Sequence, residues 1–288
     1  MNFLIVLFAI AIEMGSGGLS ALRSARWSHD WFEFSARIRA RQSWMNGWIA
    51  VVFILVLPAI GIAVIFLMLD SISSLLMHFG GLATLLLMLG PADLARDFEH
   101  SQRARQTDDE IESEFSSEVV SLDLGDSGDA DEIDDRRALA ELALHADRAW
   151  YQPIFWYFVL GPVAVVLYRL LSNLRGLETT DSNDEVIANL NRVRGWVEYV
   201  PRHIGSFCFG LAGSLVPVID ELGRRGLTPG DTHALVVHSA LAAIDNARIN
   251  EVITGNPGLY RLNQMMSLLK RALIAWLVLL ALLALVIY

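Results

Sequence analysis

Five charged or ionisable side chains lie beside long apolar stretches, and they are the residues of this chain best suited to chemistry. They are Glu13, Arg148, Arg169, Arg202 and His203. A charge in or next to the hydrocarbon region of a bilayer is costly, and such charges commonly mark binding sites or ion pathways. Arginine can also extend its charged end to lipid headgroups and serve only as an anchor. The five side chains therefore predict either a polar pocket between broken helices or a set of interfacial anchors.

Prolines stand close to three of these side chains, at Pro153, Pro162 and Pro201. Proline has no N–H and its ring clashes with the preceding turn, so it tends to break a helix. We expect Pro201, in the segment EYVPRHIGSFCFGLAGSLVPVI, to end an amphipathic helix at the bilayer surface. The next two residues, Arg202 and His203, would then lie at headgroup level. Three placements of the uncharged run 204–219 stay open: it spans the membrane, re-enters it or lies on it.

The sequence contains no familiar catalytic or cofactor motif. Its only lysine, Lys270, follows no glycine-rich phosphate loop, which excludes the P-loop nucleotide hydrolases. His233 and His238 are five residues apart and do not share a helix face, which argues against a paired metal site. The single cysteine, Cys208, excludes an internal disulfide. We therefore predict no catalytic residue, no metal and no cofactor, and we expect a protein that is not an enzyme.

The elements that must position these side chains are long apolar segments. The chain is 54% hydrophobic and 19% charged, against roughly 45–50% and about 25% in soluble domains. An apolar N-terminal stretch ends at Glu13 and lacks the basic start and cleavage site of a signal peptide. Four further runs approach the length of roughly 17–25 residues that a spanning helix needs: Trp48–Leu69, Leu75–Ala92, Ala149–Tyr168 and Ala272–Tyr288. The sequence predicts an all-α, polytopic membrane protein with about 4–5 membrane segments and a large polar loop.

Charge divides the chain into three parts. The formal net charge is −10, yet 13 of the 32 acidic residues lie between Arg105 and Arg136, where there is no basic residue. We expect N-terminal membrane segments in residues 1–92 with an arginine-rich hinge over 20–47, an acidic and partly flexible loop over 93–148, and C-terminal membrane segments with interfacial amphipathic helices in 149–288. Arginine excess in a short loop indicates the cytoplasmic side. No basic stripe is interleaved with aromatics, so the expected partner is the lipid bilayer and not nucleic acid.

Two stretches, HADRAWYQPIFWYFVLGPVAVVLYRLL and VRGWVEYVPRHIGSFCFGLAGSL, resemble the AmpE family. These are inner-membrane proteins linked to the control of β-lactamase expression, and they are related more distantly to the CobD/CbiB adenosylcobinamide-phosphate synthases. The resemblance implies a multi-pass inner-membrane protein that modulates the response to β-lactams. It also implies a cell-wall-derived ligand, or a membrane or cytoplasmic regulatory partner.

The chain departs from the synthase branch at polar positions. The synthase pattern has an Asn-and-acid motif at the positions that correspond here to Leu144, His145 and Arg148. It has Asn and Asp at the positions that correspond here to Ser172 and Arg175. These changes remove groups suited to binding a polar substrate. The resemblance thus favours a non-catalytic modulator, with a diverged membrane enzyme of the synthase type as the alternative.

Overall fold

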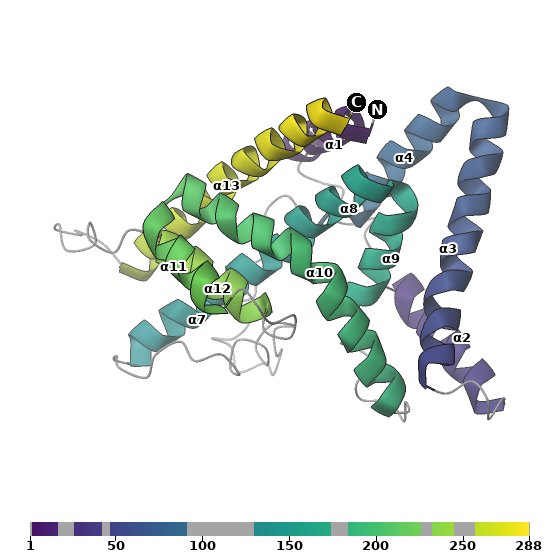
Figure 1. The fold of residues 1–288 in the computed structure, drawn as a ribbon, viewed down its shortest axis with the longest axis horizontal. Helices are drawn as coiled ribbons and strands as arrows, with labels where there is room; N and C mark the ends of the chain where they lie inside the picture. Colours follow the sequence, from purple (N-terminus) through teal and green to yellow (C-terminus); the bar gives the residue numbers. More distant parts are fainter. Residues whose placement is uncertain are drawn as a thin grey trace. The chain divides into compact units, whose positions relative to one another are not determined.

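The computed structural model describes residues 2–16, 26–41, 47–90, 130–173, 184–225, 232–244 and 257–287. Within these ranges every regular element is a helix, as predicted (Figure 1). The chain forms two compact units that each combine distant stretches. Unit 1 consists of residues 1–92 and 152–197, and unit 2 of residues 93–151 and 198–288. Most of the predicted acidic loop, residues 93–129, lies outside the described ranges.

Unit 1 contains a helical hairpin. Its helices are α1 (Asn2–Ser16), α2 (Arg26–Arg41), α3 (Gly47–Ile72), α4 (Ser74–Met88), α8 (Gln152–Leu160), α9 (Pro162–Ser172) and the first part of α10 (Asp184–Ala212). Ser73 joins α3 to α4, and its hydroxyl oxygen accepts the N–H of Leu75 at 3.3 Å. This cap satisfies one of the free N–H groups at the start of α4 and makes the tight turn possible.

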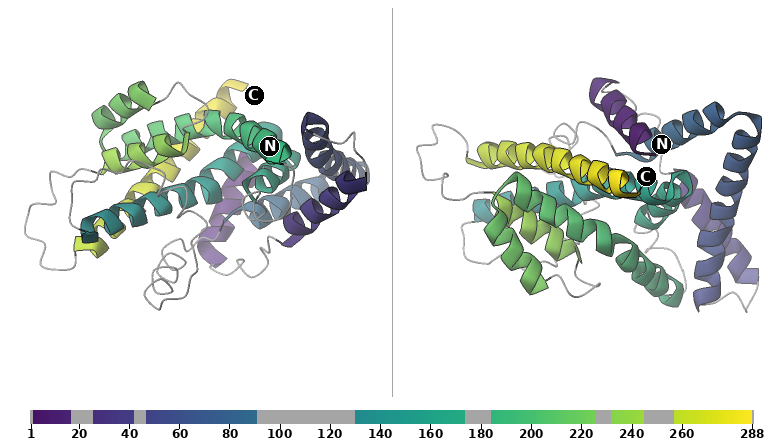
Figure 2. Two further views of the ribbon diagram at one scale, coloured as in Figure 1. Left: turned by 90° about the horizontal axis from the view of Figure 1, so that it is seen from below. Right: turned by 45° about the horizontal axis from the view of Figure 1, so that its top comes forward.

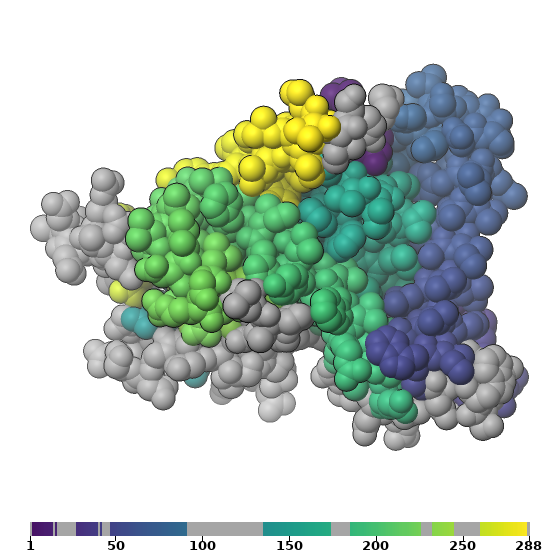
Figure 3. All heavy atoms as spheres, in the orientation of Figure 1, coloured from purple at the N-terminus to yellow at the C-terminus, as the bar shows by residue number. Residues whose placement is uncertain are grey.

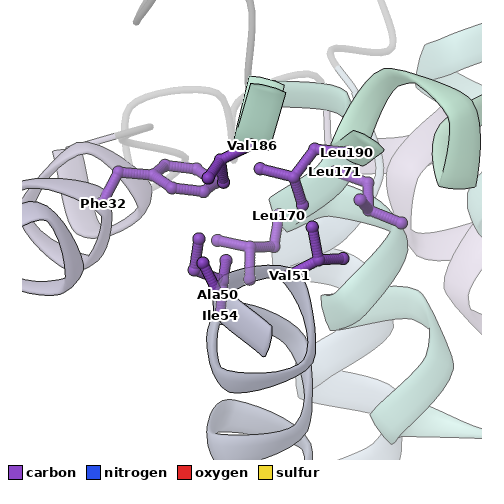
Figure 4. Close-up of a cluster of buried hydrophobic side chains, with 8 residues drawn as sticks. All are labelled: Phe32, Ala50, Val51, Ile54, Leu170, Leu171, Val186 and Leu190. Atoms are coloured by element: carbon purple, nitrogen blue, oxygen red, sulfur yellow. The ribbon is translucent and has the colours of Figure 1, made fainter. Parts of the chain in front are cut away.

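The core of unit 1 joins α2 to α3, α9 and α10. Eight buried side chains form it, as Figure 4 shows: Phe32, Ala50, Val51, Ile54, Leu170, Leu171, Val186 and Leu190. The arginine-rich segment 20–47 therefore does not serve only as a polar hinge, because residues 26–41 form a helix that places Phe32 in this core. Trp27 and Trp31 of α2 also pack against this core.

Unit 2 is a helical bundle around Tyr151. Its elements are α7 (Ala130–Ala146), a π-helical turn (Asp147–Tyr151), the second part of α10, α11 (Leu215–Arg225), α12 (Thr232–Ala243) and α13 (Pro257–Ile287). The helices α11 and α12 lie side by side, and α7 packs on both α12 and α13 (Figure 2). Tyr151 donates its hydroxyl to the carbonyl oxygen of Leu269 at 2.8 Å and packs edge-on against Phe209 and Trp276.

Two helices are long and apolar enough to cross a membrane, namely α3 and residues Tyr260–Val286 of α13. Both present side chains at the surface of their own unit (Figure 3). On α3 these include Val52, Ile60 and Leu67, which are 55%, 54% and 69% exposed. The predicted segment 149–168 is not one helix, because Gly161 adopts a φ of 80° between α8 and α9. Of the expected segments, these two alone among the described helices reach spanning length.

The expectation that Pro201 ends a helix is wrong. The helix α10 runs without interruption from Asp184 to Ala212 with Pro201 inside it. A proline inside a helix costs about 3 kcal/mol, and an ion pair between Glu198 and Arg202 brackets it on the same helix. The uncharged run 204–219 is also divided, because α10 ends before Gly213 and α11 begins at Leu215. This run therefore does not form a single spanning helix.

Candidate functional site

The most concentrated polar chemistry in unit 2 surrounds Arg202, whose side chain is 0% exposed. Its Nε donates to Oδ2 of Asp147 at 2.9 Å. Its Nη1 lies 2.8 Å from Oε2 of Glu198 and forms an ion pair with it. One guanidinium thus contacts two carboxylates inside the protein. We call Arg202, Asp147, Glu198, Thr232 and His233 the Arg202 cluster.

Three separate elements bring the Arg202 cluster together. Glu198 and Arg202 are four residues apart on α10, so they share one face of that helix. Asp147 is the first residue of the π-helical turn that follows α7. Thr232 and His233 begin α12, where the Thr232 hydroxyl accepts from Arg202 Nη1 at 2.8 Å and His233 Nε2 lies 3.4 Å from the same nitrogen. The cluster therefore ties α12 and the π-helical turn to α10.

The carboxylates of the cluster offset part of the cost of burying the Arg202 guanidinium. A buried guanidinium loses its hydration, and carboxylates at 2.8–2.9 Å compensate for that loss. The formal charges of Arg202, Asp147 and Glu198 sum to −1. His233 is 23% exposed, and its Nε2 lies 4.0 Å from Glu198 Oε2, so a proton on this imidazole would bring the sum to zero. The arrangement can hold charge, orient helices and respond to a change at His233.

The structure places the five residues predicted from sequence in both units. Glu13 on α1 and Arg169 on α9 belong to unit 1, whereas Arg148, Arg202 and His203 belong to unit 2. Glu13 and Arg148 are both buried. His203 is half-buried, and its Nδ1 lies 2.7 Å from the carbonyl oxygen of Tyr199.

The expectation that Arg202 lies at headgroup level is wrong, because its side chain is buried. An arginine that anchors a helix end to lipid keeps its guanidinium exposed. Arg202 instead holds its guanidinium inside unit 2 against Asp147 and Thr232. The proline before it does not break the helix, so Arg202 lies in mid-helix and points into the protein.

Sequence reasoning missed four members of the cluster: Asp147, Glu198, Thr232 and His233. The spacing of Glu198 and Arg202 was a readable signal, since opposite charges four residues apart on a helix can pair. His233 was weighed only as a partner of His238 for a metal. Asp147 and Thr232 lie 55 and 30 residues from Arg202, and no local pattern connects them to it.

Neither metal-ligand geometry nor similarity to known proteins assigns a function to this site. Among the residues that the structure describes, no group of three or more His, Cys, Asp or Glu side chains is arranged to hold a metal ion. No protein-family model matches the sequence, and neither a curated protein nor a solved structure matches it.

Proposed function

We propose that this chain is an integral, multi-pass protein of the inner membrane in which α3 and α13 cross the bilayer. The 26 residues of α3 exceed the roughly 20 that a spanning helix needs. Large apolar side chains of α3 are exposed at the surface of the protein, and a contiguous apolar patch of this kind is unfavourable in contact with water. Lipid tails would cover them at no such cost. Extraction of membranes at alkaline pH tests this proposal, because an integral protein stays in the pellet and a peripheral one is released.

Within that membrane we propose an AmpE-like role, in which the chain modulates β-lactamase induction and catalyses no reaction itself. The observation that carries this proposal is the Arg202 cluster. Arg202, a charged residue of the resembling stretch, has its guanidinium bound by Asp147, Glu198 and Thr232 of the same protein. Such an enclosed cluster is suited to setting the relative positions of helices. The input would be a cell-wall-derived ligand or a regulatory partner in the membrane or cytoplasm.

The test is induction of β-lactamase in a strain that lacks this protein. We expect wild-type protein to restore the induced activity, and Arg202→Met to fail at equal membrane abundance. Arg37→Gln is the matched control, because Arg37 is an exposed arginine that pairs with Glu33 on the same helix, α2. Unchanged induction in the strain without the protein would contradict the proposed role.

A second candidate function, that of a diverged membrane enzyme of the adenosylcobinamide-phosphate synthase type, is favoured by one observation. The sequence lacks the carboxylates of the synthase motif, yet the fold brings Asp147 and Glu198 together beside Arg202 and His233. Carboxylates next to an arginine are groups that a polar substrate requires. Expression in a strain without the synthase separates the two functions: growth that depends on cobalamin synthesis supports the enzyme, and its absence at normal membrane abundance supports the modulator.

A further inference from the structure

A cavity of about 320 Å³ lies in unit 2, apart from the Arg202 cluster. Its walls come from the turn between α10 and α11, from the end of α12 and from one face of α13. The size is at the lower end of the roughly 300–1,000 Å³ of small-molecule sites. The turn is held to α12 by the N–H of Ser214, which donates to the carbonyl oxygen of Ala243 at 3.1 Å. The cavity is thus framed by backbone contacts.

The polar part of the cavity comes mainly from α13. Gln264, Ser267 and Arg271 all line it, and their spacing of three and four residues places them on one helix face. Arg271 Nε donates to the carbonyl oxygen of Ser267 at 3.3 Å, so the arginine side chain leans back over the turn that carries the other two. Ser214 adds a second hydroxyl from the turn between α10 and α11.

The charge of the lining points to an anion. Arg271 is the single charged residue among the residues that line the cavity, and none of them is acidic. Arg271 makes no ion pair with another residue of the described ranges, and its hydrogen bond to the Ser267 carbonyl oxygen uses only its Nε. A guanidinium offers five N–H donors, and two serine hydroxyls add two more. Phosphate oxygens match such a set of donors.

The position along α13 indicates where the anion would come from. Arg271 directly precedes the uncharged stretch 272–287, which completes this membrane-length helix. Arg271 lies inside α13, where the charged part of the helix changes to the uncharged part, and this boundary in a spanning helix lies near the level of the lipid headgroups. A phosphate at this depth can belong to a lipid or to a small soluble ester that reaches the membrane surface.

We propose that this cavity binds an anionic phosphate ester, with Arg271 as the principal contact and Ser214, Ser267 and Gln264 as its polar supports. This binding goes beyond the regulatory role proposed above, and it can fail or succeed without changing the outcome of the induction assay. The competing interpretation is that Arg271 only anchors α13 through nonspecific attraction to lipid headgroups.

The chain offers a control for that interpretation. Lys270 is the adjacent residue, has the same charge, lies at the same depth of α13 and is exposed, but it does not line the cavity. Lys270→Gln and Arg271→Gln therefore remove the same charge from the same part of α13. Ser267→Leu is a third variant, which fills cavity space without changing any charge.

The experiment is isothermal titration of the full-length protein in a nonionic detergent with three soluble probes. These are dihexanoyl phosphatidylglycerol, dihexanoyl phosphatidylcholine and sn-glycerol 3-phosphate. We expect saturable binding of an anionic probe, weakened roughly tenfold or more by Arg271→Gln and by Ser267→Leu, and within about twofold of wild type in Lys270→Gln. Binding of the phosphatidylglycerol alone identifies a lipid headgroup site, and equal binding of glycerol phosphate identifies a site for a free ester.

Three results would overturn the proposal. The first is the absence of saturable binding by both anionic probes. The second is equal affinity for the phosphatidylcholine, which would show that the acyl chains determine binding. The third is an equal loss in Lys270→Gln and Arg271→Gln, which would reduce Arg271 to a general surface charge.

Discussion

Trp31 on α2 donates its indole N–H to the backbone carbonyl oxygen of Ile54 on α3 at 3.1 Å. Ile54 is four residues before Pro58, which lies inside α3 and has no N–H to donate back to that carbonyl. The indole therefore supplies the hydrogen bond that the proline removes from the helix. The same ring packs against Phe53 with a centroid distance of 6.3 Å. This contact explains how a membrane-length helix tolerates an internal proline next to a buried core.

The first prediction is that Trp31 and Pro58 are energetically coupled. Trp31→Phe keeps most of the ring but leaves the Ile54 carbonyl without its donor, and should cost about 1–2 kcal/mol of unfolding free energy. Pro58→Ala restores a backbone N–H, so the same tryptophan substitution should cost about 1 kcal/mol less in that background. Unfolding of the purified protein by sodium dodecyl sulfate, followed by circular dichroism, measures both. Trp48→Phe, at a half-exposed position of α3, is the control, and equal costs in the two backgrounds would refute the coupling.

The second prediction contrasts two neighbouring basic residues on α10. Arg202→Lys should destabilise unit 2 by about 1–3 kcal/mol, because one ammonium cannot contact Asp147 and Glu198 in the geometry of the guanidinium fork. His203→Arg should be nearly silent, since the half-buried His203 lies outside the cluster and bonds back to Tyr199. Thermal unfolding of the two variants decides between them. A silent Arg202→Lys would return Arg202 to the role of a helix-end anchor.

The third prediction concerns a close approach of two backbones in unit 2. A Cβ at Gly213 would clash with the carbonyl oxygen of Ala243, which also accepts the Ser214 N–H. Gly213→Ala should therefore lower the melting temperature, by an amount that corresponds to roughly 1–3 kcal/mol. Gly205→Ala is the matched control on α10, where a Cβ meets nothing within 4 Å. Gly205→Ala should be neutral or stabilising, by up to about 1 kcal/mol, because alanine favours a helix over glycine. A harmless Gly213→Ala would mean that the turn and α12 are not in contact.

The fourth prediction uses the single cysteine as a reporter of folding. Cys208 is fully buried on α10, and burial raises the pKa of its thiol to about 12. Only the thiolate reacts quickly with maleimides, so at pH 8 the folded protein should react at least about tenfold more slowly than the denatured protein. Mass spectrometry after a timed exposure to N-ethylmaleimide measures the rate. Gly223→Cys in a Cys208→Ala background provides an exposed thiol on α11 for comparison, and equal rates at the two positions would show that α10 is not packed as described.

The amino-acid sequence by itself determined the helical character of the chain. Uncharged runs such as 48–69 and 272–288 favour helices because lipid or a protein core requires every backbone group to be paired within the segment. The structure contains α3 and α13 at these positions. These features depend on neighbours in the sequence, and local composition is sufficient to predict them.

The tertiary structure decided where these helices end and which polar groups contact one another. Pro201 has the same local preference as any proline, yet α10 continues through it, and Glu198 and Arg202 pair across it. Gly161 interrupts an apolar run that composition alone predicts to be continuous. Asp147 reaches Arg202 across 55 residues, and Trp31 reaches Ile54 across 23. Such contacts are strong because packing brings the polar groups together and excludes water around them. This burial exists only in the folded protein, so no short stretch of sequence predicts it.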